Sequence, residues 1–314
     1  MTGRLYQELR NQINLRPERQ TTPRYSVTGD ILSFQICRRQ YGFFTHRKYT
    51  PAHVVQAWYG QIIHQVLDKL HLHYSGSLNP AHRGILPTDD EVEAYFNAVD
   101  QSLRAKGLHH INSGLRVQAL RVIKKFNQIE GATLYPRIID TECNFQSTHG
   151  NFILEGVVDV LSSSTQQTET TQFAQVEIWD YKGSKYPNPS TDSGKTKLQR
   201  YIFQMMVYAE LYRLKMGQYP LKANLYFVNE LDKSNISSRP DNAIFEIDFT
   251  NPENLSNITN AIEKFCQTVR EIEDCKAHDQ WNPPAVMPDE ETCTICDKRW
   301  DCSAVGNHFP MRYP

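Results

Sequence analysis

The sequence has almost no net charge, no long hydrophobic run and no secretory signal. Its 314 residues include 34 Lys and Arg against 35 Asp and Glu, so the formal net charge is −1. Such a chain has no global field that would attract a polyanion, and any contact with nucleic acid must be local. No uninterrupted apolar stretch approaches the ~18 residues of a membrane-spanning helix, and the first thirty residues contain no apolar signal core. We therefore expect a cytoplasmic protein that does not use a membrane.

The number of cysteines is odd, which argues against complete disulfide pairing. The seven cysteines cannot all pair, and without a secretory signal a disulfide framework is a poor interpretation. A reducing compartment fits better. Three of the seven, Cys293, Cys296 and Cys302, lie close together in the Pro-rich segment 281–302. We expect this segment to be irregular and to be held by something other than a hydrophobic core.

Helical and strand patterns alternate in blocks along the chain. Apolar residues recur at helical spacing in the helices expected at 53–74, 91–103, 115–129, 196–216 and 254–273. Segments rich in β-branched and aromatic residues predict strands at 137–145, 152–161, 173–182, 223–229 and 243–249. The first three strands should form a meander, with a tight turn at 149–151 and a polar loop at 162–172. This order predicts an α/β (α+β) domain with a mixed β-sheet flanked by helices.

Two acids and a lysine stand on neighbouring expected strands. Asp159 lies near the end of one strand, and Asp180 and Lys182 lie two residues apart on the next. The period of a strand places Asp180 and Lys182 on the same face. Carboxylates that hold a hard divalent cation, together with a lysine, suit metal-assisted phosphodiester hydrolysis. An ordinary ion pair at a strand end is the alternative interpretation.

Three further polar residues lie on expected helices. His64 flanks the apolar face of the first helix, and Gln204 and Tyr208 lie four residues apart on a later one. Taken alone, each is more typical of packing. In order, however, "GQIIHQVLDKL", "EGVVDVL", "EIWDYKGSK" and "QMMVYAELY" resemble the four motifs of the RecB-like branch of the PD-(D/E)XK nucleases.

The resemblance implies a restriction-endonuclease-like core and a role for each matching residue. Its metal ligands for Mg²⁺ or Mn²⁺ would be His64, Asp159, Asp180 and the backbone carbonyl of Tyr181. Its catalytic residues would be Asp159, Asp180, Lys182, Gln204 and Tyr208, with Gln204 and Tyr208 positioning the lysine and the DNA. Gln199 and Tyr201 form a weaker competing pair. Glu177 has the opposite strand parity to Asp180, so we do not expect it among the metal ligands.

The clustered cysteines form a CxxC followed by a third cysteine. A thiolate site of this kind holds zinc or an iron–sulfur cluster, and both usually need a fourth cysteine. Cys37, in "SFQICRRQYGF", resembles the lone N-terminal cysteine of RecB-like exonucleases that carry a [4Fe-4S] cluster, such as AddB nuclease domains and small CRISPR-associated nucleases. The resemblance implies a cluster on Cys37, Cys293, Cys296 and Cys302, with zinc as the alternative. We expect Cys143, Cys266 and Cys275 to be bystanders.

With this resemblance, the chain divides into three expected parts. These are an N-terminal segment (1–52), a nuclease core (53–250) with a helical insertion at about 80–131, and a C-terminal segment (251–314). The two terminal segments would together form an iron–sulfur subdomain.

Basic residues are unevenly distributed in the sequence. Segment 34–49 has four Arg and Lys among aromatics and no acid, 181–200 carries net +4, and 271–301 carries net −6. Basic groups among aromatic rings suit single-stranded DNA. The expected DNA contacts are Arg38, Arg39, Tyr41, Lys185, Lys195, Lys197 and Arg200.

These patterns together predict a metal-dependent DNA exonuclease that acts on single-stranded DNA or DNA ends. One alternative is a nuclease-fold subunit that holds DNA for a helicase or integrase partner and cuts little by itself. Another is an endonuclease on the same fold. Nuclease activity of the isolated chain would distinguish the first alternative.

Overall fold

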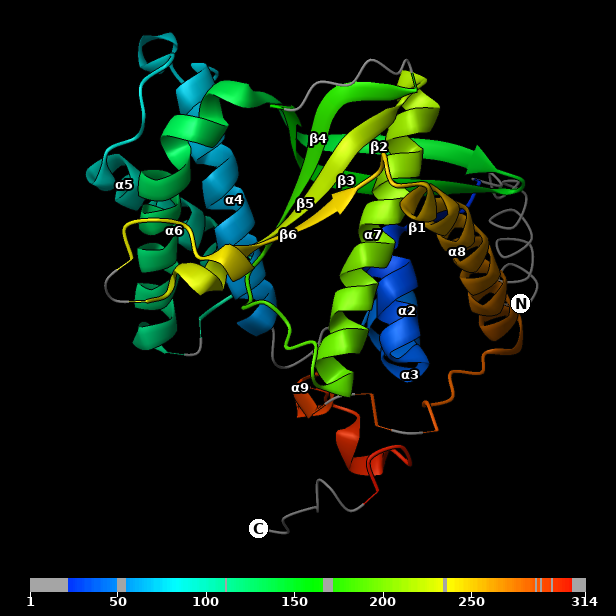
Figure 1. Cartoon of the computed structure of the whole chain (residues 1–314). Helices are drawn as coiled ribbons and strands as arrows, with labels where there is room; N and C mark the ends of the chain where they lie inside the picture. Colours follow the sequence, from blue (N-terminus) through cyan, green and yellow to red (C-terminus); the bar gives the residue numbers. More distant parts are fainter. Residues whose placement is uncertain are drawn as a thin grey trace, which may run out of the picture.

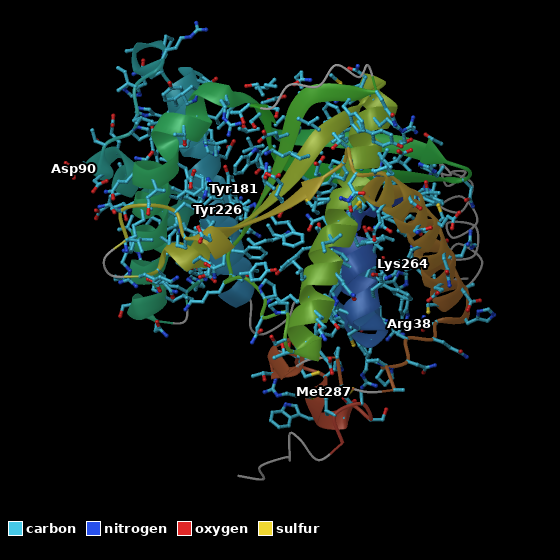
Figure 2. The ribbon with its side chains drawn as sticks, in the orientation of Figure 1. Arg38, Asp90, Tyr181, Tyr226, Lys264 and Met287 are labelled. Atoms are coloured by element: carbon cyan, nitrogen blue, oxygen red, sulfur yellow. The ribbon has the colours of Figure 1, made fainter. Side chains whose placement is uncertain are left out.

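In the computed structural model of this chain, a mixed β-sheet lies between two groups of helices (Figure 1). The structure describes residues 22–49, 55–110, 112–165, 172–233, 236–285, 287–288, 290–294 and 296–306. Side chains fill the space between the sheet and both groups of helices (Figure 2), and each face of the sheet has its own buried apolar cluster. The predicted mixed sheet flanked by helices is therefore confirmed.

Six strands form the sheet. They are β1 (Arg24–Ser26), β2 (Ile138–His149), β3 (Phe152–Ser163), β4 (Phe173–Lys182), β5 (Tyr219–Phe227) and β6 (Ile244–Asp248). β2, β3 and β4 pair antiparallel, as predicted for a meander, whereas β5 is parallel to β4 and β1 is parallel to β3. Gly150 has a φ of 59° in the two-residue turn between β2 and β3, a conformation that glycine adopts without strain.

One edge of β3 is shared by two strands. β2 pairs with β3 over nearly its whole length, from Phe152 to Ser162, so β4 and β1 must use the opposite edge. β4 pairs only with Val160 to Ser163, and β1 only with Ile153 to Glu155. Between these two ladders the edge of β3 opens into a fork, at residues 156–159.

One face of the sheet is covered by a helical layer of α4 (Val55–Ser75), α5 (Asp89–Ala105) and α6 (Ser113–Leu134). Its buried residues include Trp58 and Phe126, which pack with Trp179 and Tyr181 of β4. The predicted helical insertion at 80–131 thus forms α5, α6 and their connections, and it packs against α4. α5 begins with a capping box, in which Thr88 and Glu91 bond each other's backbone.

The other face is covered by α7 (Asp192–Met216) and α8 (Pro252–His278), with the short helices α2 (Ser33–Ile36) and α3 (Arg38–Gln40) beside them (Figure 1). α7 begins four residues earlier than the sequence pattern predicted, because the Thr191 side chain caps it by accepting a hydrogen bond from the Gly194 N–H. It ends at Gly217, which has a φ of 84°.

The C-terminal segment returns to the N-terminal helices. Beyond α8 it is irregular except for α9 (Glu290–Thr294) and a 3₁₀ turn, as its composition predicted. Trp281 packs directly against Gly42, where an added Cβ would lie 2.3 Å from the indole Cγ. The Gln40 side chain donates a hydrogen bond to the backbone carbonyl of Thr292, at 3.0 Å. Among the described helices, none combines the length and the apolar composition needed to span a bilayer.

Candidate active site

A cleft of about 1330 Å³ opens at the fork in the sheet. Residues from α4, β2, β3, β4 and α7 line it, and they include six of the residues singled out in the sequence: His64, Asp159, Asp180, Lys182, Gln204 and Tyr208. The last β3–β4 pair is Val160 with Trp179. Asp159 and Asp180 are the next residues on the two strands, so the carboxylates lie where the strands separate.

Asp180, Lys182, Gln204 and Tyr208 form one hydrogen-bonded chain. The Lys182 Nζ lies 2.5 Å from the Asp180 Oδ2 and donates to the Gln204 Oε1 at 2.7 Å. The Gln204 Nε2 donates to the Asp180 Oδ1 at 2.7 Å and to the Tyr208 hydroxyl oxygen at 3.0 Å. The glutamine therefore holds the carboxylate and the lysine at the same time, in a region where Asp180 and Gln204 are both buried.

Asp159 is held by a second set of contacts. Its Oδ2 accepts a hydrogen bond from the Tyr181 backbone N–H at 2.7 Å, and the same oxygen lies 3.1 Å from the His64 Nδ1. The Tyr181 N–H thus bridges the fork between β4 and β3. This contact uses the Tyr181 N–H and not its carbonyl, so the role of the Tyr181 carbonyl as a metal ligand stays a prediction.

The sequence analysis missed Glu142, which the structure places in this cleft. Ligand atoms of His64, Glu142 and Asp159 all lie within 4.8 Å of one another. Asp180 belongs to no such group among the described residues. Glu142 lies on β2 with a φ of 50°, between the pairs Thr141–Val160 and Cys143–Val158, so it faces Asp159 across the ladder. No local pattern marks a single glutamate in a polar strand.

The other residues weighed for the site in the sequence lie in different places: of Gln199, Tyr201 and Glu177, only Tyr201 lines the cleft. Tyr201 lies in the cleft, with its ring centroid 4.5 Å from the Lys182 Nζ, whereas Gln199 lines a different cavity. Gln204 is thus the glutamine that contacts the lysine. Glu177 is buried outside the cleft between Arg137 and Lys222, at 3.5 and 3.7 Å, in agreement with its opposite strand parity.

The acids and the histidine of the cleft shift one another's protonation. Burial raises the pKa of Asp180, and the charge of Asp159 adds to this, while Lys182 opposes it. Burial acts to raise the pKa of Asp159 too, but His64 and the Tyr181 N–H outweigh it and the pKa is lowered. Burial would lower the pKa of His64, but Asp159 raises it to about 9. Partial enclosure of its carboxyl group and the nearby Asp159 raise the pKa of Glu142 to about 7.

This donor set suits a divalent cation. Three carboxylates and an imidazole converge on one cleft, where the Lys182 ammonium contacts one of the carboxylates, Asp180. Uncompensated like charges at this separation are costly. Carboxylate oxygens and one imidazole nitrogen are ligands that Mg²⁺ or Mn²⁺ accepts.

A model of the PD-(D/E)XK nuclease superfamily matches residues 28–303 of the sequence. The chain belongs to this superfamily. The nuclease fold is also similar to the crystal structure of a presumed exonuclease from Eubacterium rectale, with a TM-score of 0.50 and 12% sequence identity over 95% of this chain and 92% of that one. At this identity the likeness concerns the fold alone. The solved structure of SSO0001 is 13% identical over 88% of this chain and 98% of that one, but its TM-score of 0.28 supports no argument. No curated protein matches the sequence.

In this nuclease the four cysteines singled out in the sequence line one small cavity. Cys37 is the single extended residue between α2 and α3, with a φ of −156°. Cys293 lies in α9, and Cys296 lies just after it. All three are buried, and Cys302 is half-buried. The chain ends thus bring together residues that are far apart in sequence. Cys143 is buried in β2, and Cys266 and Cys275 pack against the core on α8.

The predicted DNA contacts in segment 34–49 need a correction. Arg38 forms an ion pair with Glu271, and Arg39 pairs with Asp301 at 2.8 Å. Tyr41 is buried, so its ring cannot stack on a base in this conformation. The acidic C-terminal segment folds back onto this basic segment, and charges that are separate in sequence neutralise each other.

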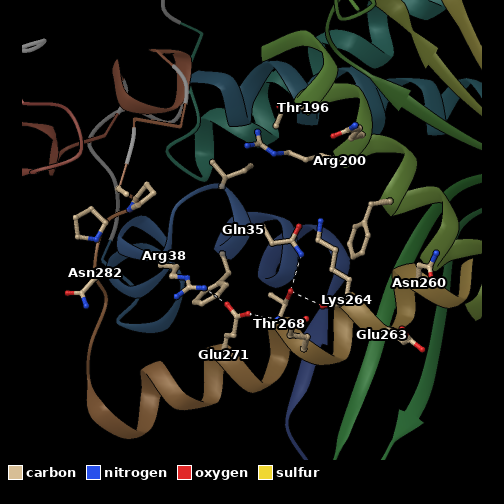
Figure 3. Close-up of a pocket in the computed structure, with 18 residues that line it drawn as sticks. Gln35, Arg38, Thr196, Arg200, Asn260, Glu263, Lys264, Thr268, Glu271 and Asn282 are labelled. Carbon is tan, nitrogen blue, oxygen red and sulfur yellow. Dashed lines mark hydrogen bonds and ion pairs between the residues drawn. The ribbon is translucent and has the colours of Figure 1, made fainter. Parts of the chain in front are cut away.

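The other predicted DNA contacts lie in two places. Lys197 lines the active-site cleft, while Lys185 and Lys195 are exposed near the start of α7. Arg200 instead lines a second cavity of about 970 Å³ between α2, α7 and α8 (Figure 3). Lys264 of α8 also lines that cavity. α7 therefore separates the two cavities and presents basic residues to both.

Proposed function

We propose that this protein is a metal-dependent DNA exonuclease of the RecB-like, iron–sulfur type, which hydrolyses phosphodiester bonds in single-stranded DNA or at DNA ends. The observation that carries the proposal is the convergence of His64, Asp159, Asp180, Lys182 and the Gln204–Tyr208 pair on one cleft. These residues also follow the motif order of the RecB-like branch. A subunit that only holds DNA would have no need for the complete set.

Each residue of the cleft has a proposed role in metal binding or in hydrolysis. Asp159, Asp180, His64 and the backbone carbonyl of Tyr181 would hold Mg²⁺ or Mn²⁺. We add Glu142 as a further ligand, because its carboxylate lies within 4.8 Å of the ligand atoms of His64 and Asp159. A bound cation would stabilise the negative charge that develops on the phosphate and would lower the pKa of an attacking water. The Lys182 ammonium, held by Gln204, binds the scissile phosphate and orients the water. The Tyr208 hydroxyl holds the Gln204 side chain in place, and the absence of a side chain at Gly156 leaves room for the Tyr208 ring.

For the cysteine site we favour a [4Fe-4S] cluster, with zinc as the alternative, because one cysteine before the nuclease core and three after it follow the pattern of the iron–sulfur exonucleases. All four cysteines line one small cavity. The role of the cluster would be structural, joining the two ends of the domain.

The DNA path proposed for this nuclease follows α7. Lys197 contributes a positive charge inside the cleft. Lys185 in the β4–α7 connection and Lys195 in the first turn of α7 are exposed and would contribute two more. A few phosphate contacts of this kind give binding that depends on ionic strength. Because the total charge is near zero, a helicase or integrase partner that delivers the strand would compensate for weak binding.

The proposal predicts loss of cleavage when the chain Asp180–Lys182–Gln204 is broken. Asp180→Asn or Lys182→Ala should lower the rate of Mn²⁺-dependent degradation of end-labelled single-stranded DNA by about 10³-fold. The matched controls are Asp90→Asn and Lys106→Ala, which change exposed residues of the helical layer. Circular dichroism would confirm that all four variants are folded. Full metal-dependent cleavage by both cleft variants would exclude this site.

A further inference from the structure

A second cluster of ligand-type side chains lies outside the cleft, in the helical layer. It contains His73 from the last turn of α4, His82 from the 3₁₀ turn Pro80–His82, and Glu91 from the first turn of α5. One ligand atom from each lies within 4.8 Å of the other two. Asp90, labelled in Figure 2 at the outer edge of the molecule, is the neighbour of Glu91. None of the three residues lines the active-site cleft.

The two histidines are stacked, and each has a nitrogen without a partner. The ring centroids are 4.1 Å apart, with the planes at 21°. His73 is fully buried, at 0% exposure. The Nε2 of His73 and the Nδ1 of His82 are both buried, and neither atom has a hydrogen-bond partner among the described residues. A buried polar atom without a partner is costly, and two such atoms in contacting rings indicate a shared ligand.

The surrounding hydrogen bonds leave the right atoms available. The His73 Nδ1 lies 2.9 Å from the Tyr95 hydroxyl, so a proton on Nδ1 leaves the Nε2 lone pair free for a metal, as is usual for histidine ligands. Glu91 accepts two hydrogen bonds from Thr88, from its backbone N–H at 2.8 Å and its hydroxyl at 2.9 Å, and both use Oε2. The capping box therefore does not use Oε1.

We propose that His73, His82 and Glu91 bind Zn²⁺, with water in the fourth position. Two imidazoles and one carboxylate form a borderline ligand set that suits zinc and does not suit Mg²⁺ or Ca²⁺, which prefer oxygen. The ion fastens the turn that follows α4 to the start of α5, and so it stabilises the helical layer. This role is independent of the proposed nuclease activity.

Only a small closure is needed to bind the ion. Tetrahedral zinc with bonds of ~2.1 Å holds its ligand atoms about 3.4 Å apart. His73 is fixed in a helix and Glu91 by its capping box, so His82 is the ligand that moves. It lies in a short 3₁₀ turn, and the contact of its Nε2 with the Asn79 Nδ2 is long, at 3.4 Å. That contact must open, because a metal on Nδ1 leaves the proton on Nε2.

The test uses the full chain, purified anaerobically so that the cysteine site is filled, and stripped of loosely bound metal. Excess Mg²⁺ occupies the nuclease cleft. Zinc titration followed by dialysis and elemental analysis should then show one more zinc per chain in the wild type than in His82→Asn or Glu91→Gln. Glu91→Gln suits this purpose because glutamine also completes a capping box. His109→Asn, an exposed histidine of the same layer, is the matched control and should keep the zinc.

A second readout separates binding from folding. Without zinc, Glu91→Gln and the wild type should unfold at nearly the same temperature. Saturating zinc should raise Tm of the wild type and of His109→Asn by on the order of 5 °C, and should leave His82→Asn and Glu91→Gln unchanged. Equal zinc content and equal shifts in all four proteins would overturn the proposal, whatever the nuclease activity.

Discussion

Glu142 combines two unfavourable features in a single residue of the active site. It faces the carboxylate of Asp159 across the β2–β3 ladder, and like charges directly opposite destabilise a strand pair. Its backbone also has a φ of 50°, which costs a residue other than glycine on the order of 1–3 kcal/mol. A cation bound between the two carboxylates would turn the repulsion into attraction. The sequence did not suggest Glu142 as a metal ligand, whereas its position opposite Asp159 favours that role.

Glu142→Gln should therefore weaken metal binding and stabilise the metal-free protein. We expect Mn²⁺ affinity, measured by calorimetry, to fall by about tenfold, because one anionic ligand is lost. The free energy of unfolding without metal should rise by up to ~1 kcal/mol, because the repulsion by Asp159 is removed. Glu263→Gln on the exposed surface of α8 is the control. Unchanged Mn²⁺ affinity in the Glu142 variant would remove it from the site.

At the scale of the elements, the fork in β3 creates the site. Strand β2 occupies one edge of β3, and the opposite edge is divided between β4 and β1. In the gap, Gly156 faces α7, where an added Cβ would lie 2.6 Å from the Tyr208 ring. The absence of a side chain lets α7 approach the sheet closely enough for Gln204 to reach Asp180 and Lys182.

Gly156→Ala should consequently disrupt the site through α7. The methyl group would displace Tyr208, and overpacking of this kind costs about 1–3 kcal/mol of stability. DNA cleavage should fall by at least about tenfold, because the hydrogen bonds that Gln204 makes would be lost. Gly114→Ala, in the first turn of α6, serves as the control. Wild-type cleavage and Tm in the Gly156 variant would show that the close approach of α7 has no role.

At the scale of the whole molecule, the described parts of the N-terminal and C-terminal segments are held against each other. Three arginines of the N-terminal segment pair with acids of the C-terminal one: Arg38 with Glu271, Arg39 with Asp301, and Arg47 with Asp279. These pairs are largely exposed, and pairs of this kind contribute little each. The contact of Trp281 with Gly42 and a metal group on the four cysteines would contribute more.

The cysteine site leads to a prediction for the whole chain. Anaerobically purified protein should absorb at about 400 nm and contain about four irons per chain. Cys302→Ser should lose both signals and lower Tm, because the C-terminal segment is released. Cys266→Ser, which changes a half-buried cysteine of α8, should retain the iron. Tightly bound zinc that Cys302→Ser loses, in protein that contains no iron, would refute the cluster and support the zinc alternative.

Local patterns in the sequence determined much of this protein. The period of a strand was enough to place Asp180 and Lys182 on one face and Glu177 on the other. Helical spacing located α4, α7 and α8 to within about five residues, with the largest differences at the capped start of α7 and at the end of α8, which extends to His278. The order of the motifs also selected the residues that meet in the cleft. The strand and helix patterns depend on backbone geometry within ten or so residues, which the sequence contains directly, whereas the motif order spans His64 to Tyr208 and rests on the resemblance to the RecB-like branch.

Tertiary structure alone decided the rest. Only the β2–β3 register brings Glu142 opposite Asp159, and only the return of the C-terminal segment places Glu271 and Asp301 against Arg38 and Arg39. The basic segment therefore looked available for DNA in the sequence, whereas its charges are neutralised in the fold. The histidine and glutamate cluster of the helical layer was also invisible. The arginine pairs join segments more than 200 residues apart, and the other two sets join different strands, helices or turns. Each therefore depends on how whole elements pack and not on any local period.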